Sequence, residues 1–324
     1  MKIAVGISGG VDSAVAALLL KEQGHEVVGV TMTLGRAAVN GRGRPLSRDD
    51  EEKSLVEAKE VAARLDVPLE VFDFAAEWQK QVLDYIRATY RAGQTPNPCV
   101  RCNEAVKFGL LPRGAFERLG CDRFATGHYA RLEGGRLLRA VDRAKDQSYF
   151  LYRVAPEILA RTILPLGALT KAEVRERARA FGLPVAEKGD SQDFCGGDIG
   201  RIVALPPREG RIVRSDGKVL GVHQGFWNYT IGKRKGLGVG GGTPYYVLRL
   251  DAARNEVIVG TREETFRTTL ELRETVGRID FSLPVKVRSA GEPRLLSDGI
   301  SGVASGQSAV FYDGDTVVGG GIIV

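Results

Sequence analysis

Residues 2–13 read KIAVGISGGVDS, an apolar run followed by two glycines, two serines and an aspartate. The run KIAVGI predicts a buried strand, and the helical pattern VDSAVAALLLKEQG starts directly after the glycines and ends at Gly24. The backbone N–H groups of a glycine pair can approach an anion closely, and the start of the following helix adds positive charge. The stretch therefore predicts a phosphate-binding loop between a strand and a helix.

The side chains of this loop indicate which phosphate chemistry it serves. Ser8 and Ser13 offer hydroxyl donors, whereas Asp12 would repel a bare phosphate and is better suited to hold a Mg²⁺ ion. The loop lacks the G-x-x-x-x-G-K-[ST] spacing and has no lysine, which favours chemistry at the α-phosphate over transfer of the γ-phosphoryl group. The structural alternative is a tight strand-to-helix turn that serine or aspartate caps.

Strand and helix patterns alternate over the first 130 residues. The strand patterns HEVVGVTMTL, PLEVFDF and RFATG are separated by helical patterns, among them DDEEKSLVEAKEVAARLD and residues 103–119. This alternation predicts an α/β fold, a parallel sheet with helices on both faces. Ligands of such sheets bind at the carboxyl ends of the strands, where SGGVDS lies.

After Gly196 the pattern changes to short β-rich runs that glycine and aspartate turns separate, which predicts small barrel-like β domains. We therefore expect three domains: residues 1–200, a central β-rich domain at 201–266 and a C-terminal β-barrel domain at 267–324.

The composition permits several functions and excludes few. The chain has 324 residues, of which 43% are hydrophobic, enough for the cores of two or three domains. The formal net charge of +6 permits a polyanionic partner without requiring one. The N-terminus is apolar for only a few residues and no stretch approaches membrane length, so we expect a cytoplasmic protein without a membrane segment.

Two of the four cysteines form a C-x-x-C in TPNPCVRCN, which in a cytosolic chain indicates metal or sulfur chemistry. A helix N-terminus lowers the pKa of a thiol, so we expect Cys99 or Cys102 to be a thiolate near neutral pH. Cys195 lies in the glycine-rich segment GDSQDFCGG, and Cys121 precedes an apolar strand, where we interpret it as a buried structural cysteine.

Seven motifs follow one another along the chain: SGGVDS, TPNPCVRCN, ATGHYA, KDQSYFL, SQDFC, YTIGKRKGLGVGG and GQSAVFYDGD. SGGVDS resembles the pyrophosphate loop (PP-loop) of ATP pyrophosphatases, which adenylate a carbonyl oxygen and release pyrophosphate. Together the motifs closely resemble the tRNA-specific 2-thiouridylase family. The resemblance implies an N-terminal PP-loop domain followed by β-rich central and C-terminal β-barrel domains. It also implies ATP-dependent replacement of the C2 oxygen of the wobble uridine in certain tRNAs by sulfur.

The resemblance also implies roles for individual residues. The nucleotide-binding residues would be Gly6, Ile7, Ser8, Gly9, Gly10, Val11, Asp12 and Ser13 at the phosphates of ATP, with Met32 and Gly127 at the adenine and ribose. The target base would meet Asn97, Pro98 and Cys99, and further tRNA contacts would come from His128, Lys145, Asp146, Gln147 and Gln307. Cys102 matches the nucleophile of the family and Cys195 the cysteine that carries a persulfide. The implied partners are tRNA and a sulfur donor, either sulfide or a sulfur-carrier protein.

Many members of the family have aspartate where this chain has Cys99. Cys99 and Cys102 together with Cys195 therefore have the pattern of ligands to a 4Fe–4S cluster, with one iron left open to bind hydrosulfide. In the persulfide route, a disulfide between Cys102 and Cys195 would release the sulfur. We expect the cluster and keep the persulfide as the alternative.

Other interpretations remain open at this point. The loop alone is equally suited to an adenylating ligase that forms amides, and a tRNA-binding protein without catalytic activity is a third hypothesis. His128 is either a tRNA contact or a hydrogen-bonded structural residue. The aromatic residues Tyr149, Phe150 and Tyr152 are either stacking contacts for nucleic acid or part of a core.

Overall fold

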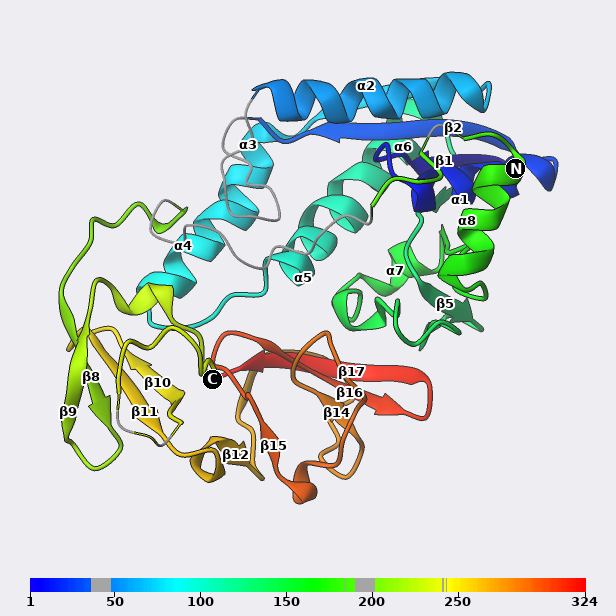
Figure 1. Ribbon diagram of the computed structural model, residues 1–324. Coiled ribbons are helices and arrows are strands. Elements are labelled where there is room, and N and C mark those ends of the chain that lie inside the picture. Colours follow the sequence, from blue (N-terminus) through cyan, green and yellow to red (C-terminus); the bar gives the residue numbers. More distant parts are fainter. Residues whose placement is uncertain (36–47, 184, 190–201, 241, 243) are drawn as a thin grey trace.

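The computed structural model describes residues 1–35, 48–183, 185–189, 202–240, 242 and 244–324, without the side chains of residues 48–50 (Figure 1). Cys195, one of the predicted catalytic and cluster-binding cysteines, lies outside the described residues.

The first part of the chain forms the predicted parallel sheet, and the α/β prediction is confirmed. Its strands are β1 (Lys2–Gly6), β2 (Glu26–Thr33), β3 (Leu69–Asp73), β4 (Arg123–Ala125) and β7 (Thr162–Ile163). Their order in the sheet is β3-β2-β1-β4-β7, and each neighbouring pair is parallel. The strand order reverses between β1 and β4, and such a switch point is where open parallel sheets bind ligands.

Helices cover both faces of this sheet (Figure 1). Three of them, α1 (Val11–Glu22), α2 (Arg48–Arg64) and α8 (Lys171–Ala180), contribute to one apolar core. The opposite core contains Phe108 and Leu111 from a long helical run, namely α5 (Pro98–Cys102), the π-helix η2 (Asn103–Leu110) and α6 (Leu111–Leu119). The run therefore reaches from the two cysteines to the wall of the sheet.

A second helical run connects the sheet to the central β-rich part. It consists of α3 (Ala75–Trp78), the π-helix η1 (Gln79–Leu83) and α4 (Asp84–Arg91). The central sheet has the order β10-β11-β8-β9, with β8 (Gly210–Arg214), β9 (Val219–His223), β10 (Tyr246–Asp251) and β11 (Glu256–Gly260). Trp78 and Val82 from the run share one apolar core with Ile212 and Trp227, so the two parts are packed together.

The C-terminal part forms a curled sheet with the order β14-β16-β17-β6-β5, to which β13 is added by pairing with β17. These strands are β13 (Leu272–Gly277), β14 (Val285–Lys286), β16 (Ser308–Asp313), β17 (Thr316–Ile323), β5 (Ala130–Glu133) and β6 (Arg136–Arg139). The hairpin β5–β6 belongs to the first 200 residues, yet Leu138 pairs with Thr316 of β17. The first and last parts of the chain therefore share a sheet.

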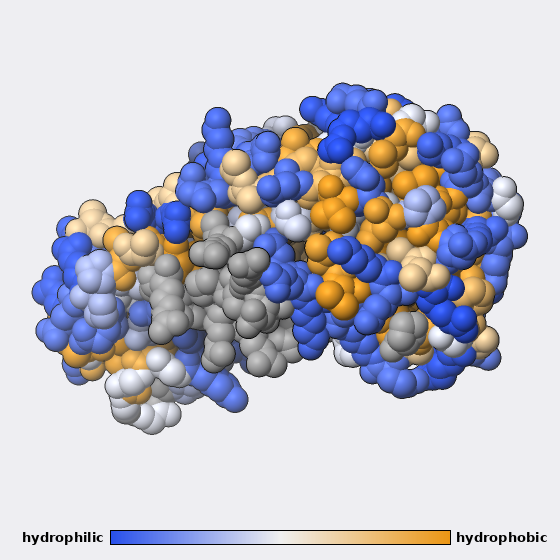
Figure 2. Space-filling view, turned by 90° about the horizontal axis from the view of Figure 1, so that it is seen from above, coloured by the Kyte–Doolittle hydropathy of each residue, from blue (hydrophilic) through white to orange (hydrophobic). Residues whose placement is uncertain are grey.

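The remaining elements are short. They are α7 (Pro156–Leu159), the strands β12 (Phe266–Arg267) and β15 (Ile300–Ser301), and the 3-10 helices η3 (Ser148–Phe150), η4 (Phe226–Asn228), η5 (Glu263–Thr265) and η6 (Leu296–Asp298). Over the described ranges, every helix is too short or too polar to span a bilayer. Figure 2 shows hydrophilic residues over much of one face, with hydrophobic residues gathered over the part that carries the parallel sheet.

Candidate functional site

A pocket of about 610 Å³ lies at the carboxyl ends of β1 and β4, at the switch point of the sheet. This volume is in the range of small-molecule binding sites. The pocket brings together many of the predicted site residues: Gly6, Ile7, Ser8, Asp12, Ser13, Met32, Gly127, His128, Lys145, Asp146 and Gln147. We call it the switch-point pocket.

Other predicted residues are absent from the described lining of the pocket: Gly9, Gly10, Val11, Asn97, Pro98, Cys99, Cys102 and Gln307. The first three are the outer part of the glycine loop and the start of α1. The helical run that carries both cysteines nevertheless reaches the pocket, because Lys107 and Leu111 line it.

Hydrogen bonds of Ser8 and Ser13 stabilise the conformation of the loop between β1 and α1. The Ser13 hydroxyl accepts a hydrogen bond from the Ser8 N–H at 3.2 Å and donates one to the Gly10 carbonyl at 3.0 Å. Gly9 has a φ of +71°, and a Cβ at this position would lie 2.7 Å from the Cβ of Glu57, so the loop requires glycine there. No side chain caps the N-terminus of α1 within the described residues, so amides of its first turn are available to an anion.

Two lysines from distant parts of the chain contact this loop. Lys171 donates to both carboxylate oxygens of Asp12, at 2.7 and 2.8 Å, and the Tyr129 hydroxyl donates to Oδ1 of the same carboxylate at 2.8 Å. Lys188 donates to the Gly9 carbonyl at 3.0 Å and to Glu57 at 2.6 Å. The loop has no lysine of its own, but the tertiary structure supplies cations to it, which the sequence analysis missed.

Local structure fixes the position of Lys171. Thr170 and Glu173 form a capping box that sets the start of α8, with Lys171 as the first residue of the helix. A lysine in the first turn is unfavourable next to the positive end of the helix. That mismatch in TKAEVRERARAFG is a signal in the sequence that Lys171 has an anionic partner elsewhere.

Gly127 packs directly against the phosphate loop. A Cβ at this residue would lie 2.6 Å from the Asp12 carbonyl carbon and 2.7 Å from the Ser13 nitrogen, closer than real Cβ contacts.

We expect Gly127→Ala to displace the loop, lower ATP affinity by about tenfold or more and reduce the free energy of unfolding by about 1–3 kcal/mol. Calorimetric ATP titration and denaturant unfolding measure both. An unchanged ATP affinity in Gly127→Ala would contradict this role. Gly120→Ala is not a suitable control, because Gly120 has a φ of +63° that alanine rarely adopts. Gly189→Ala, with open space around its Cβ, is the matched control.

His128 is a neutral, hydrogen-bonded residue. Its Nδ1 lies 2.9 Å from the Thr126 hydroxyl, and its ring centroid lies 5.3 Å from that of Phe108. Burial, with a smaller contribution from the charge of Lys107, lowers the pKa of His128 from 6.5 to about 3. The ring therefore carries no charge at neutral pH, and its predicted contact with tRNA stays a prediction.

This shift predicts a pH dependence of stability. Between pH 6.5 and 3 the unfolded chain protonates His128 while the folded chain does not, so the free energy of unfolding falls as the pH falls. The slope from one such group is up to about 1.4 kcal/mol per pH unit. Denaturant unfolding of His128→Gln between pH 6.5 and 4.5 should show a flatter dependence than the wild type. Parallel curves for the two proteins would rule out this contribution.

The two described cysteines of the motif lie on α5, which Asn97 caps. The Asn97 side chain accepts a hydrogen bond from the Val100 N–H at 3.2 Å, and Pro98 occupies the first turn. Burial raises the pKa of the Cys102 thiol, against the opposing effects of Lys107 and the Trp78 side chain. Cys102 is the last residue of α5 and is packed against an apolar core, which opposes the effect of the helix N-terminus. The expectation that Cys99 or Cys102 is a thiolate stays a prediction.

The C-terminal β part holds the segment before α5. Gln307 donates to the carbonyls of Thr95 and Pro96 at 3.2 and 2.6 Å, and its Oε1 accepts from Asn97 at 3.4 Å. Two residues for which tRNA contacts are predicted, Asn97 and Gln307, are therefore brought together across 210 positions. Their contacts within the protein position α5, and their contacts with tRNA stay predictions.

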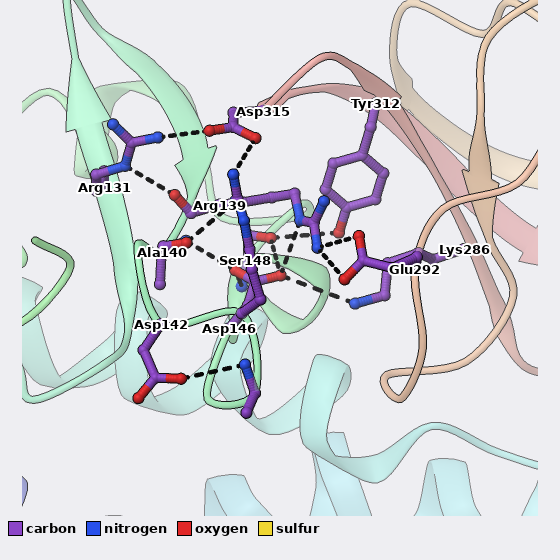
Figure 3. A network of polar contacts seen from close by, with 12 residues as sticks. Arg131, Arg139, Ala140, Asp142, Asp146, Ser148, Lys286, Glu292, Tyr312 and Asp315 are labelled. Atoms are coloured by element: carbon purple, nitrogen blue, oxygen red, sulfur yellow. Dashed lines mark hydrogen bonds and ion pairs between the residues drawn. The ribbon is translucent and has the colours of Figure 1, made fainter. Parts of the chain in front are cut away.

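Asp146 lies in a buried polar network between the first and last parts of the chain (Figure 3). Its side chain is 1% exposed and forms ion pairs with Arg139 at 3.7 Å and with Lys286 of β14 at 3.8 Å. It also accepts hydrogen bonds from the Ala140 N–H and from Ser148. The carboxylate anchors the segment around Lys145 and Gln147 to the C-terminal sheet, and a tRNA contact of this side chain stays a prediction.

The aromatic residues of KDQSYFLYRV are core residues. Tyr149, Phe150 and Tyr152 are 0%, 9% and 7% exposed and pack in one cluster with Val310 and Tyr312 of β16. Of the two interpretations of these residues, the structure favours the core, because rings this buried have no free face for a base. Cys121 is also buried, as expected.

Comparison with protein families covers nearly all of the chain. Family models match residues 1–196 (tRNA methyl transferase HUP domain), 203–261 (tRNA methyl transferase PRC-barrel domain) and 262–323 (aminomethyltransferase beta-barrel domain). A solved 4-thiouridine synthetase bound to RNA and ATP is 16% identical and covers 63% of this chain and 50% of that one, at a TM-score of 0.36 that is too low to compare the folds.

Curated relatives are similar over their full length. The tRNA-specific 2-thiouridylase MnmA of Endomicrobium trichonymphae is 42% identical over 100% of this chain and 99% of that protein. The corresponding protein of Acidithiobacillus ferrooxidans is 44% identical over 99% and 98%, and that of Pelobacter propionicus is 43% identical over 100% and 97%. These matches confirm the resemblance that the motifs indicate, and the chain belongs to the tRNA-specific 2-thiouridylase family.

Proposed function

We propose that this protein is a tRNA-uridine 2-sulfurtransferase. It adenylates the C2 oxygen of the wobble uridine with ATP, releases pyrophosphate, and replaces the oxygen by sulfur to give 2-thiouridine and AMP. The observation that carries this proposal is that one helical run both carries the two cysteines and lines the pocket. It bears Cys99 and Cys102 on α5, and its next turns supply Lys107 and Leu111 to the wall of the switch-point pocket.

The residues of the pocket fit ATP. Uncapped amides of α1 and the hydroxyls of Ser8 and Ser13 suit phosphate oxygens, and Met32 offers an apolar side chain for the adenine. They also fit one Mg²⁺ ion, which typically takes one or two carboxylates and fills its remaining positions with phosphates and water. Asp12 is that carboxylate. When bound, the ion would neutralise phosphate charge, and Lys171 would then be free to turn from Asp12 to a phosphate.

The protein's own residues prepare the sulfur transfer. Asn97 and Gln307 fix the start of α5, and burial raises the pKa of the Cys102 thiol. C2 of uracil is a poor electrophile until its oxygen is adenylated, so the sulfur is transferred only after that step.

We propose that a 4Fe–4S cluster holds the sulfur, with a persulfide on Cys195 as the alternative. Cys99 and Cys102 lie three positions apart on α5, a spacing that puts both side chains on one face. Cys195 would complete the set, and the described part of the chain contains no group of three metal-binding side chains without it. Such a cluster would supply an open iron that binds hydrosulfide.

The proposal extends to the partners and the division of the chain. We propose that residues 1–200 form the ATP-binding catalytic domain, residues 201–266 a β-rich domain that binds tRNA, and residues 267–324 a β-barrel domain. Sulfide or a sulfur-carrier protein would deliver the sulfur. ATP and tRNA meet in the cytoplasm, where we place the protein.

Anaerobic incubation of the purified protein with tRNA, ATP and sulfide tests the activity. We expect 2-thiouridine in the digested tRNA, together with AMP and pyrophosphate, and its absence under these conditions would contradict the proposal. Amide formation in a second incubation with ammonia in place of sulfide, without sulfur transfer in the first, would instead identify an adenylating ligase. Binding of tRNA without any product would identify a binding protein.

The variant Cys99→Asp separates the two sulfur routes. If the cluster operates, the variant loses iron and activity together, because an aspartate replaces one thiolate ligand. If the persulfide route operates, the variant keeps its activity and the wild-type protein is active without iron. Iron and sulfide analysis with an absorption spectrum distinguishes the two results.

A further inference from the structure

Lys107 lies on the π-helix η2, five residues after Cys102, and lines the switch-point pocket. Cys102 ends α5, and η2 begins at the next residue, so the thiol and Lys107 belong to one continuous helical run. Of these two residues, Lys107 lines the pocket.

The charge of Lys107 has no anionic partner in the described part of the chain, where no hydrogen bond or ion pair to it occurs. Its neighbours around the phosphate loop differ in this respect, since Lys171 is paired with Asp12 and Lys188 with Glu57. The side chain is nevertheless half-buried. An ammonium group in the wall of a pocket, without an anionic neighbour among the described residues, attracts anions, so this part of the pocket is suited to an anionic ligand.

The neighbours of Lys107 show which part of the switch-point pocket it lines. Lys107 and His128, which follows β4, both line the pocket, and the ring centroid of Phe108, the next residue of η2, lies 5.3 Å from that of His128. Lys107 therefore belongs to the wall of the pocket near the end of β4, on the helical run that carries Cys102. Lys171 instead lies at the glycine loop, where it pairs with Asp12.

The proposed reaction decides which phosphate meets each cation, so this inference rests on the proposed function. A sulfur nucleophile must come within about 3–3.5 Å of C2 of the uridine, and the oxygen on that carbon is bonded to the α-phosphorus. The α-phosphate is therefore the phosphate nearest the cysteine. The β- and γ-phosphates leave as pyrophosphate and belong to the glycine loop.

We propose that Lys107 binds the α-phosphate of the nucleotide, at the wall of the pocket formed by the helical run that carries Cys102. It is a substrate-binding residue for which neither the motifs nor the family resemblance gave an indication. The site takes a nucleoside monophosphate group, either in ATP or in the adenylated uridine.

Calorimetric titration of the full chain with AMP, adenosine and pyrophosphate, in the absence of tRNA, tests this assignment. Lys107→Met should weaken AMP binding about tenfold or more, the scale of a charge-assisted hydrogen bond, and leave adenosine and pyrophosphate within about twofold. Lys107→Arg, which keeps the charge, should stay within about threefold of the wild type for AMP. Lys80→Met is the matched control, because Lys80 is exposed on the other π-helix.

Several results would overturn the proposal. One is an unchanged AMP affinity in Lys107→Met, and another is a loss of affinity confined to pyrophosphate. An equal loss of affinity for AMP and adenosine would indicate a structural defect. The last is a wild-type protein that binds AMP no better than adenosine. Because binding is measured without tRNA, the outcome is separate from the proposed function. A protein that makes no 2-thiouridine but shows the loss specific to AMP contradicts the activity and keeps Lys107 at the α-phosphate.

Discussion

Replacing Cys102 by alanine should reduce 2-thiouridine formation by about 10³-fold or more, the scale of removing a nucleophile from an enzyme. The thiol is the implied nucleophile, and it lies on the helical run that continues into the switch-point pocket. Alanine removes the sulfur and keeps the helix, because it is the strongest helix former. Single-turnover assays on tRNA, with mass spectrometry of the digested nucleosides, measure the product.

The remaining cysteines supply the controls. Cys121→Ala also removes a thiol, but one that is 3% exposed in the core behind the sheet, so activity should stay within about twofold while the free energy of unfolding falls by about 1 kcal/mol. Cys195→Ala should abolish thiolation as Cys102→Ala does. If Cys102→Ala retained full thiolation, the residue would not be the nucleophile, and tolerance of both changes in an enzyme that still adenylates would favour an amide-forming ligase.

Lys171→Met should lower kcat/KM for ATP by about 10²-fold, as the loss of a preorganised electrostatic group does in other active sites. Lys171 donates to both oxygens of Asp12 in the structure and would turn to a phosphate once Mg²⁺ is bound to Asp12. The methionine variant therefore lacks a cation for the phosphates in the complex, and before the ion binds it leaves the Asp12 carboxylate without a counter-charge. Steady-state thiolation at varied ATP concentration measures the effect, and thermal unfolding shows whether the variant is folded.

Two comparisons sharpen this prediction. Lys171→Arg keeps the positive charge and should recover part of the activity, although its planar group cannot copy both bonds of the ammonium. Lys59→Met removes an exposed lysine of the neighbouring helix α2 and should leave kcat/KM unchanged. An unchanged kcat/KM in a folded Lys171→Met protein would show that Asp12 needs no cation from α8.

Much of the site was predictable because its chemistry is local in the sequence. The apolar strand, the glycine pair and the start of α1 occupy one short stretch, so residues 2–13 were enough to predict a phosphate loop at the end of a parallel strand. Alternating patterns predicted the sheet for the same reason. Asn97 and Pro98 form an N-cap that can also be read from neighbouring residues.

The sequence by itself determined the phosphate loop, the α/β class, the C-x-x-C motif and the family. Only the tertiary structure decided that Lys171 pairs with Asp12 across 159 positions, that β17 is joined by the hairpin β5–β6, and that burial raises the pKa of the Cys102 thiol. The physical reason is that a local pattern specifies the conformation of a short segment. Ion pairing and the desolvation that shifts a pKa instead depend on which distant segments pack against it.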